Sequence, residues 1–296
     1  MNPAVYRQCG IFHATGFGHT EMNIDSLIPK TLPKFPQMIV GITLHDWVRY
    51  FIVAGVAWLL GYVLFQKRWR ARKINQRVPT SSDMRREFGW SLMTVVIYGL
   101  VGAGSLWLGK FGWSKMYVRF NAHSTAWFWC SVVIAIVVHD TYFYWTHRLM
   151  HHRRLFRWFH RVHHESMNPS PWAAYSFGPL EAVVQALIFP LLIFTVPMHP
   201  LAYMAFMSWQ ITFNVIGHTG YEIYPKWLMD SWAGRFINTP TNHVQHHEKP
   251  RGNYSLYFNV WDRLMGTNHH DYEARFREVT NRSDEAAKEP SLEMSQ

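Results

Sequence analysis

Residues 131–151 read SVVIAIVVHDTYFYWTHRLMH and join an uncharged apolar run directly to histidines. No glycine or proline interrupts this stretch, so it predicts one continuous helix that leaves a bilayer around Tyr144–Thr146. At 3.6 residues per turn, one stripe of that helix carries a carboxylate, a phenol and two imidazoles, on Asp140, Tyr144, His147 and His151. The stretch therefore predicts a membrane helix whose end presents a metal-binding face.

Two further clusters repeat a compact histidine spacing, His160-x-x-His163-His164 and His243-x-x-His246-His247. Positions i, i+3 and i+4 of a helix share a face, so each triad is expected to aim three rings into one volume. Imidazole is the commonest protein ligand for borderline transition metals. Together with the pair on the first helix these triads supply eight imidazoles, too many for one ion, and so they predict two metals.

Four other positions on or near these helices are candidates for the site. His218 ends the last apolar segment at the expected depth of the clusters, and an ionisable residue there is functional by default. His139 lies deeper in its span and is a further candidate ligand. Asp140 could bind a metal directly, or accept a proton from a ligand imidazole and fix its tautomer. Asp140 and Tyr144 are the candidate catalytic residues.

The apolar segments predict an all-α, multi-pass helical bundle. The chain has 296 residues, of which 49% are hydrophobic. Trp47–Phe65, Gly89–Gly109 and Ala126–Thr146 are long enough to cross a hydrocarbon core, which needs about 20 helical residues. Ala182–Met198 and Leu201–Val215 are shorter, and they predict either a hairpin of two marginal spans or a re-entrant pair. A cytosolic helical cap is expected to carry the histidine clusters.

Basic residues set the expected orientation. The net charge is +10, and the densest basic run, residues 67–73, directly follows an apolar span. This positive-inside pattern is typical of a membrane protein and excludes nucleic acid as a partner. It places the N-terminus outside and the three histidine clusters inside. The expected organisation is an N-terminal extramembrane segment (1–40), a membrane-embedded oxidoreductase domain (41–275) and a disordered C-terminal tail (276–296).

The histidine pattern resembles that of a known superfamily. Asp140-x-x-x-Tyr144-Trp145-x-His147-Arg148-x-x-His151 and the two later triads resemble the motifs of the fatty acid hydroxylase / sterol desaturase superfamily. The stretch from His164 to Glu181 is similar to the region after the second histidine box of sterol C5-desaturase-like members. Val260-Trp-Asp-Arg-Leu-Met-Gly-Thr267 resembles the C-terminal signature. The resemblance covers about residues 125–270.

The resemblance implies a multi-pass enzyme with a cytosolic centre of two irons, which uses O2 and two electrons to hydroxylate or desaturate a lipid. The eight cluster histidines would be ligands, with His218 as a further candidate. Some members carry a histidine pair in the last apolar region, where this chain has Asn214 and His218. The membrane would be a bacterial inner membrane or the endoplasmic reticulum.

Electrons would come from a separate donor, because the sequence has no nicotinamide fingerprint and no fused haem domain. That donor would be a cytochrome b5-like protein, a ferredoxin or a reductase, and the basic face from Arg148 to Arg161 suits an acidic carrier. A zinc-dependent membrane hydrolase is an alternative, although His164-Glu165 and His247-Glu248 lack the spacing of a metalloprotease helix. A metal transporter and a bis-histidine haem protein are weaker alternatives.

Overall fold

The computed structural model describes residues 34–293, and their side chains as far as residue 282. Within that range the chain is helical, with two isolated β-bridges and no strand. The apolar helices are α1 (Phe35–Trp58), α2 (Ser81–Leu108), α3 (Thr125–Met150), α6 (Pro179–Ala186), α7 (Ile188–Thr195) and α8 (Pro200–His218). The remaining helices are α4 (Phe156–Phe159), α5 (Arg161–His164), α9 (Trp227–Asp230), α10 (Pro240–Glu248), α11 (Val260–Leu264) and α12 (Tyr272–Glu293).

Three helices are long and apolar enough to cross a membrane, which confirms the three predicted spans. They cover Phe35–Leu64, Ser81–Trp113 and Thr125–Met150, the first two ending in the π-helical turns η2 (Leu59–Leu64) and η4 (Gly109–Trp113). α1 begins at Phe35, so the last six residues of the extramembrane segment predicted for residues 1–40 are helical, and the predicted boundary at residue 40 stays a prediction. Residues 1–33 lie outside the described part of the chain.

The fourth apolar segment is not one helix. It breaks between Ala186 and Ile188 into α6 and α7, and α7 ends at Thr195. Pro190 has no N–H to donate to the carbonyl four residues earlier, which is that of Ala186, so the sequence itself explains the break. After a short turn α8 returns as a helix that begins at Pro200 and packs against α3. The segment therefore forms a helical hairpin with an interrupted first arm, and the two predicted alternatives, two marginal spans or a re-entrant pair, both stay predictions.

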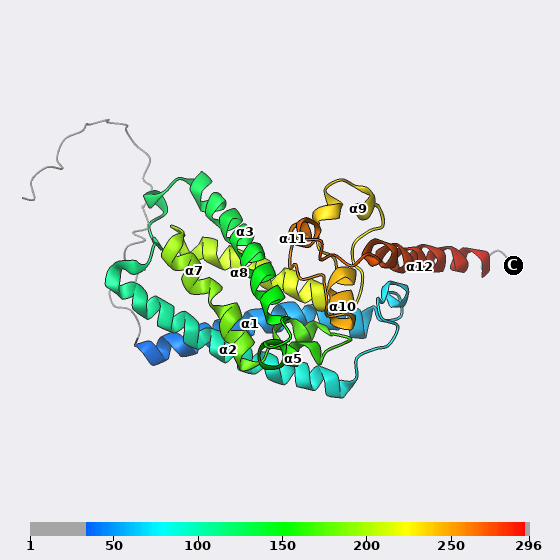
Figure 1. The fold of residues 1–296 in the computed structure, drawn as a ribbon, viewed down its shortest axis with the longest axis horizontal. Helices are drawn as coiled ribbons and strands as arrows, with labels where there is room; N and C mark the ends of the chain where they lie inside the picture. The colour runs from blue at the N-terminus through cyan, green and yellow to red at the C-terminus, as the bar shows by residue number, and fades with distance from the viewer. Residues whose placement is uncertain (1–33, 294–296) are drawn as a thin grey trace, which may run out of the picture. The chain divides into compact units, whose positions relative to one another are not determined.

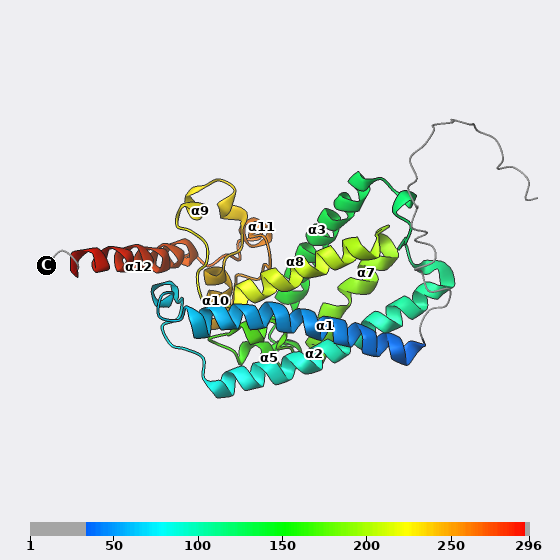
Figure 2. The ribbon, with the colours of Figure 1, turned by 180° about the vertical axis from the view of Figure 1, so that it is seen from behind.

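Figures 1 and 2 show how the elements meet. The first two spans run close together along much of their length, and α3 and α8 form a second packed pair. The C-terminal end of α3 approaches the short helices α5 and α10, and both of these carry histidines. The fold thus brings together histidines that lie far apart in the sequence.

The first two spans approach most closely at Gly99. A Cβ at this position would lie 2.0 Å from Thr43 Oγ1 and 3.2 Å from the carbonyl oxygen of Ile39. Gly99→Ala should therefore separate α1 from α2 and cost about 1–3 kcal/mol. Thermal denaturation in detergent should show a Tm lower by several degrees. Gly104→Ala, also in α2, meets nothing within 4 Å and is the control; an equal loss in both variants would contradict the packing argument.

The C-terminal region differs from expectation. A disordered tail was predicted for residues 276–296, but α12 continues through that boundary to Glu293. The reason is local packing, because Phe276 is buried with Met229 and Tyr272, and Val279 is buried with Ile74. These apolar side chains lie in an otherwise charged segment. The prediction of disorder rested on that charged composition and did not consider the spacing of the apolar residues. The ordered chain thus extends beyond the predicted boundary.

Candidate metal centre

Nine histidines gather in two adjacent groups. In each group the potential ligand nitrogens all lie within 4.8 Å of one another. The five-histidine cluster contains His147, His151, His160, His164 and His246. The four-histidine cluster contains His163, His218, His243 and His247. His151 is half-buried, and the other eight side chains are buried.

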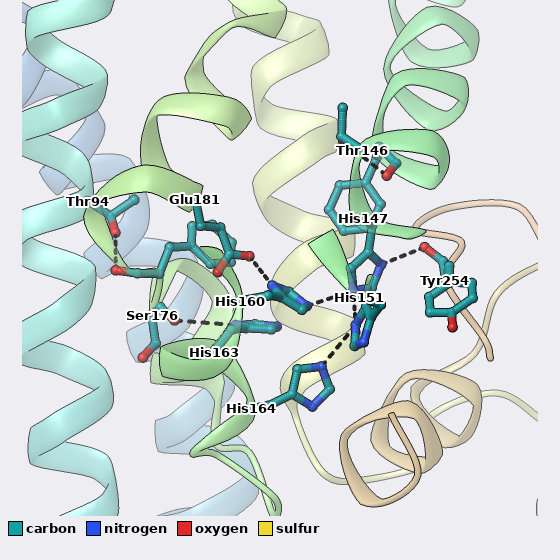
Figure 3. Close-up of polar contacts among 12 residues, drawn as sticks. Thr94, Thr146, His147, His151, His160, His163, His164, Ser176, Glu181 and Tyr254 are labelled. Atoms are coloured by element: carbon teal, nitrogen blue, oxygen red, sulfur yellow. Dashed lines mark hydrogen bonds and ion pairs between the residues drawn. The ribbon is translucent and has the colours of Figure 1, made fainter. Parts of the chain in front are cut away.

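The elements that hold the five-histidine cluster come from three parts of the chain (Figure 3). His147 belongs to the last turns of α3, and His151 caps its C-terminus, so the predicted continuous helix is confirmed. His147 Nε2 lies 2.9 Å from His160 Nε2. His246 comes from α10, and its Nε2 lies 3.1 Å from those of His151 and His164.

The four-histidine cluster forms where the end of α8 meets α10. His218 is the last residue of α8, and its Nε2 lies 3.0 Å from His243 Nε2 and 3.3 Å from His163 Nε2. A Cβ at Gly217 would touch the His243 ring at 3.4 Å, so the small residue lets α10 approach α8 closely. The two clusters adjoin, because the rings of His164 and His247 are 5.0 Å apart.

The hydrogen bonds of the outer ring nitrogens, Nδ1, show which nitrogen of each ring carries the proton. His147 Nδ1 donates to the carbonyl oxygen of Tyr254 at 2.7 Å, and His246 Nδ1 donates to that of Gly252 at 2.7 Å. In the other cluster His218 Nδ1 donates to the Asn214 carbonyl at 2.7 Å, and His163 Nδ1 donates to the Ser176 carbonyl at 3.3 Å. A carbonyl oxygen only accepts, so these contacts assign the proton to Nδ1 and leave Nε2 with a bare lone pair.

This tautomer assignment tests whether the residues fit a metal. Bare Nε2 lone pairs face one another at 3.3 Å between His163 and His218, which is repulsive without a cation between them. Protonation is not the remedy, because burial, and then the neighbouring imidazoles, lower the pKa of His163 well below its ordinary value. The pKa of His246 falls for the same reasons. A neutral, nitrogen-rich, buried donor set fits borderline metals such as iron or zinc.

Glu181 supplies a contact of a different kind. Its Oε1 accepts a hydrogen bond from His160 Nδ1 at 2.7 Å, and both side chains are buried (Figure 3). Among the residues that the structure describes, no other carboxylate forms a hydrogen bond to a clustered histidine. A carboxylate in this position fixes the ring and makes its other nitrogen a stronger donor. The sequence signal was available, since Glu181 is an acidic residue at the start of an apolar segment.

The triads do not each occupy one cluster. His163 belongs to the four-histidine cluster, whereas its neighbours His160 and His164 belong to the other. In the third motif His246 separates from His243 and His247 in the same way. The expectation of one volume per triad therefore fails. Adjacent helical residues point about 100° apart, so His163 and His164, or His246 and His247, serve sites that lie side by side.

The second motif also departs from a regular helix. His160 adopts φ −129° and ψ −5° between α4 and α5, so only His163 and His164 lie within α5. The spacing rule for a helical face therefore does not apply across His160. Its ring reaches the cluster through the bend and its contact with Glu181.

Asp140 and His139 lie outside both clusters. Asp140 Oδ1 accepts hydrogen bonds from the backbone N–H groups of Tyr257 at 2.9 Å and Phe258 at 3.2 Å. His139 Nδ1 lies 2.8 Å from the Tyr257 hydroxyl. Both side chains are thus hydrogen-bonded outside the two clusters, and their roles at the metals stay predictions. The carboxylate holds the segment that presents the Tyr254 carbonyl to His147.

Tyr144, the other candidate catalytic residue, faces the same segment. Its hydroxyl lies 2.9 Å from Thr267 Oγ1 and accepts from Arg148 at 3.1 Å. Thr267 Oγ1 in turn donates to Asp262, which also accepts from the N–H groups of Tyr254 and Ser255. These contacts give Tyr144 a positioning role around the loop after α10, and its catalytic role stays a prediction.

Comparison with known proteins bears on the same region. Residues 132–267 match the fatty acid hydroxylase family, and this range contains all nine clustered histidines. Over this range the chain resembles the fatty acid hydroxylase / sterol desaturase superfamily. With its three candidate spans, the protein is an integral membrane protein.

Curated relatives within the superfamily act on sterols by name. The chain is 31% identical over 156 residues to a Delta(7)-sterol 5(6)-desaturase of Gibberella zeae. The aligned region covers 53% of this chain and 47% of the relative. It is 30% identical over 161 residues to lathosterol oxidase of Mus musculus, covering 54% and 52%. The chain thus spans about half the length of these relatives. No solved structure gives a significant match.

Proposed function

We propose that this protein is a membrane-bound oxidoreductase that uses O2 and two electrons to hydroxylate or desaturate a lipid. The observation that carries the proposal is the pair of adjacent, buried histidine clusters, whose inward nitrogens carry lone pairs. The sterol desaturases and lathosterol oxidase among its relatives support a lipid, of sterol or fatty acyl class, as the substrate.

The chain's own residues would hold two irons through the nine clustered imidazoles. When bound, the irons supply the oxidant that an unactivated C–H bond requires. The carbonyls of Gly252 and Tyr254 hold the rings of His246 and His147 in one orientation. Burial of the rings excludes bulk water, which protects a reactive centre from side reactions. A pocket lined in part by Phe213, Asn238 and Leu256 reaches the edge of His243 and supports an approach route for a small reactant.

Electrons would arrive from a separate protein. Arg153, Arg154, Arg157 and Arg161 are exposed on the segment between α3 and α5, beside the buried His160. Such a basic surface suits an acidic carrier of the cytochrome b5, ferredoxin or reductase type. The positive-inside pattern places this surface and the metal centre on the cytosolic side, in a bacterial inner membrane or the endoplasmic reticulum.

Zinc hydrolysis is the alternative. A catalytic zinc site usually has three protein ligands and an open position, whereas here four and five imidazoles converge. A transporter would place ligands midway through several spans. Here the first histidines lie at the last turns of α3, near its end.

Lipid mass spectrometry tests the proposal directly. Cells that express the chain should accumulate a lipid that differs from its precursor by one oxygen or two hydrogens, and the product should stop forming when O2 is removed. A matched strain that expresses the His163→Ala variant controls for host enzymes. Product formation that continues without O2 would contradict the proposed O2-dependent oxidation and favour hydrolysis.

A further inference from the structure

The segment between α8 and α10 exposes two large aromatic side chains. It contains α9 and the 3-10 turn η7 (Gly234–Phe236). Trp227 is 65% exposed and Trp232 is 80% exposed. Large aromatic side chains that are mostly exposed and gathered on one segment are typical of an interaction site.

The tryptophans are held outward by an ordered turn. Beneath them Met229 is buried against Tyr272 and Phe276 of α12. Ser231 Oγ donates to the Leu228 carbonyl at 2.7 Å and accepts from the Gly234 N–H at 2.9 Å. A rigid inner face fixes the outward direction of the tryptophans, so their exposure is built into the fold.

α11 connects this segment with the end of a span. Arg263 Nε of α11 donates to the Arg235 carbonyl at 2.7 Å. On its other side, Trp261 Nε1 donates to Thr141 Oγ1 of α3 at 3.2 Å, and its ring lies 5.7 Å from that of Trp145. Both views draw α11 between α3 and α9 (Figures 1 and 2). The sequence predicts that residues 131–151 leave the bilayer around Tyr144–Thr146, and this predicted exit would put α11 at the level of the membrane surface.

The elements that these contacts link also expose apolar side chains. Leu264 at the end of α11 is 70% exposed, and Trp145 and Leu149 on the neighbouring end of α3 are also exposed. Their position at the end of a candidate span favours lipid as the occupant over a soluble protein. Trp is the residue that membrane interfaces prefer.

The charges beside the tryptophans also favour a lipid surface. Lys226 and Arg235 lie on either side of the two tryptophans in the sequence, and the acidic residue between them, Asp230, is paired with Arg277 at 2.9 Å. The remaining positive charge suits lipid phosphates, which attract basic residues at a membrane surface.

We propose that residues 223–236 form an interfacial segment that immerses Trp227 and Trp232 in the headgroup layer of the same bilayer that α3 spans. The segment leads directly into Asn238 and Thr239, which line the pocket at His243. An apolar surface in contact with lipid is thereby joined to the four-histidine cluster. The depth of this segment in the membrane does not depend on the reaction, so a failed depth test would leave the proposed oxidoreductase activity untouched.

Depth-dependent quenching tests the proposal on the full chain in nanodiscs. In a background where Cys9 and Cys130 are serine, a bimane label is placed at Trp232→Cys or Trp227→Cys. Lipids brominated near the headgroup should reduce its fluorescence roughly twofold or more, as for a group at the headgroup–acyl boundary. Val137→Cys, exposed near the middle of α3, is the membrane control, and Asn281→Cys, exposed on α12, is the aqueous control.

Two results would overturn the proposal. In the first, the brominated lipids do not quench bimane at either tryptophan position, and aqueous iodide quenches it as strongly as at Asn281→Cys. In the second, the lipids do not quench bimane, and iodide quenches it less as the number of chains per disc rises. That result would assign the surface to a second copy of the chain. Because Trp232 is 80% exposed, its replacement leaves the fold intact.

Discussion

Replacing His163 by alanine should lower the bound metal from about two ions per chain to about one and abolish lipid oxidation. His163 is one of four imidazoles in its cluster, and its Nε2 lies 3.3 Å from that of His218. Three remaining ligands bind a metal more weakly, whereas the five-histidine cluster keeps its full donor set. Elemental analysis of the purified protein gives the metal content, and product analysis gives the turnover.

The matched control is His152→Ala. His152 is exposed next to His151, and its ring only accepts from the Arg154 N–H at 3.4 Å. This variant should retain about two ions and full turnover, because exposed imidazoles outside a cluster contribute little to binding. A wild-type protein with one ion or less would contradict the two-metal proposal, and turnover by His163→Ala would contradict its role as a ligand.

Glu181→Gln should weaken metal binding at the five-histidine cluster by roughly 10- to 100-fold. The amide retains an acceptor oxygen for His160 Nδ1 but loses the negative charge that strengthens the ring as a donor. The affinity is measured by competition with a chelator, and the absorption or Mössbauer spectrum of the iron-loaded protein reports on one of the two ions. We expect the other ion to keep its signature, because Glu181 contacts His160 alone among the clustered histidines.

Glu165→Gln is the control for this substitution. Glu165 follows His164 in the sequence, but its side chain is exposed and forms only a 3.7 Å ion pair with Arg161. Its replacement should change neither the affinity nor the spectrum. If both variants lose metal equally, or if Glu181→Gln changes both ions alike, the carboxylate does not act through His160.

Local spacing in the sequence predicted part of this site. The pair His147 and His151 lies one helical turn apart on an uninterrupted helix, and the structure confirms that helix. His218 could be proposed from its depth alone, and it does lie in a cluster. Each of these features depends on short-range periodicity, which a sequence displays directly.

Other features depend on tertiary contacts that no local pattern encodes. The Asp140 carboxylate binds backbone N–H groups more than 100 positions away in the chain, a contact that its stripe on α3 did not predict. The division of the triads follows from two sites lying side by side across one helical face. The Gly252 carbonyl reaches His246 because the glycine adopts φ +121°, and a Cβ there would lie 2.6 Å from the Thr267 carbonyl oxygen.

α3 has a mechanical consequence because it is one unbroken rod from its lipid-facing half to His147. Spans adapt to thinner or thicker bilayers by tilting, and a rod without a hinge transmits that tilt to its end. The segment that orients His246 through the Gly252 carbonyl is tied to the same rod, because Asp140 of α3 binds the Tyr257 N–H. A tilt of this span is therefore transmitted together to the histidines of α3 and to the segment that orients His246, which should keep these ligands aligned when membrane thickness changes.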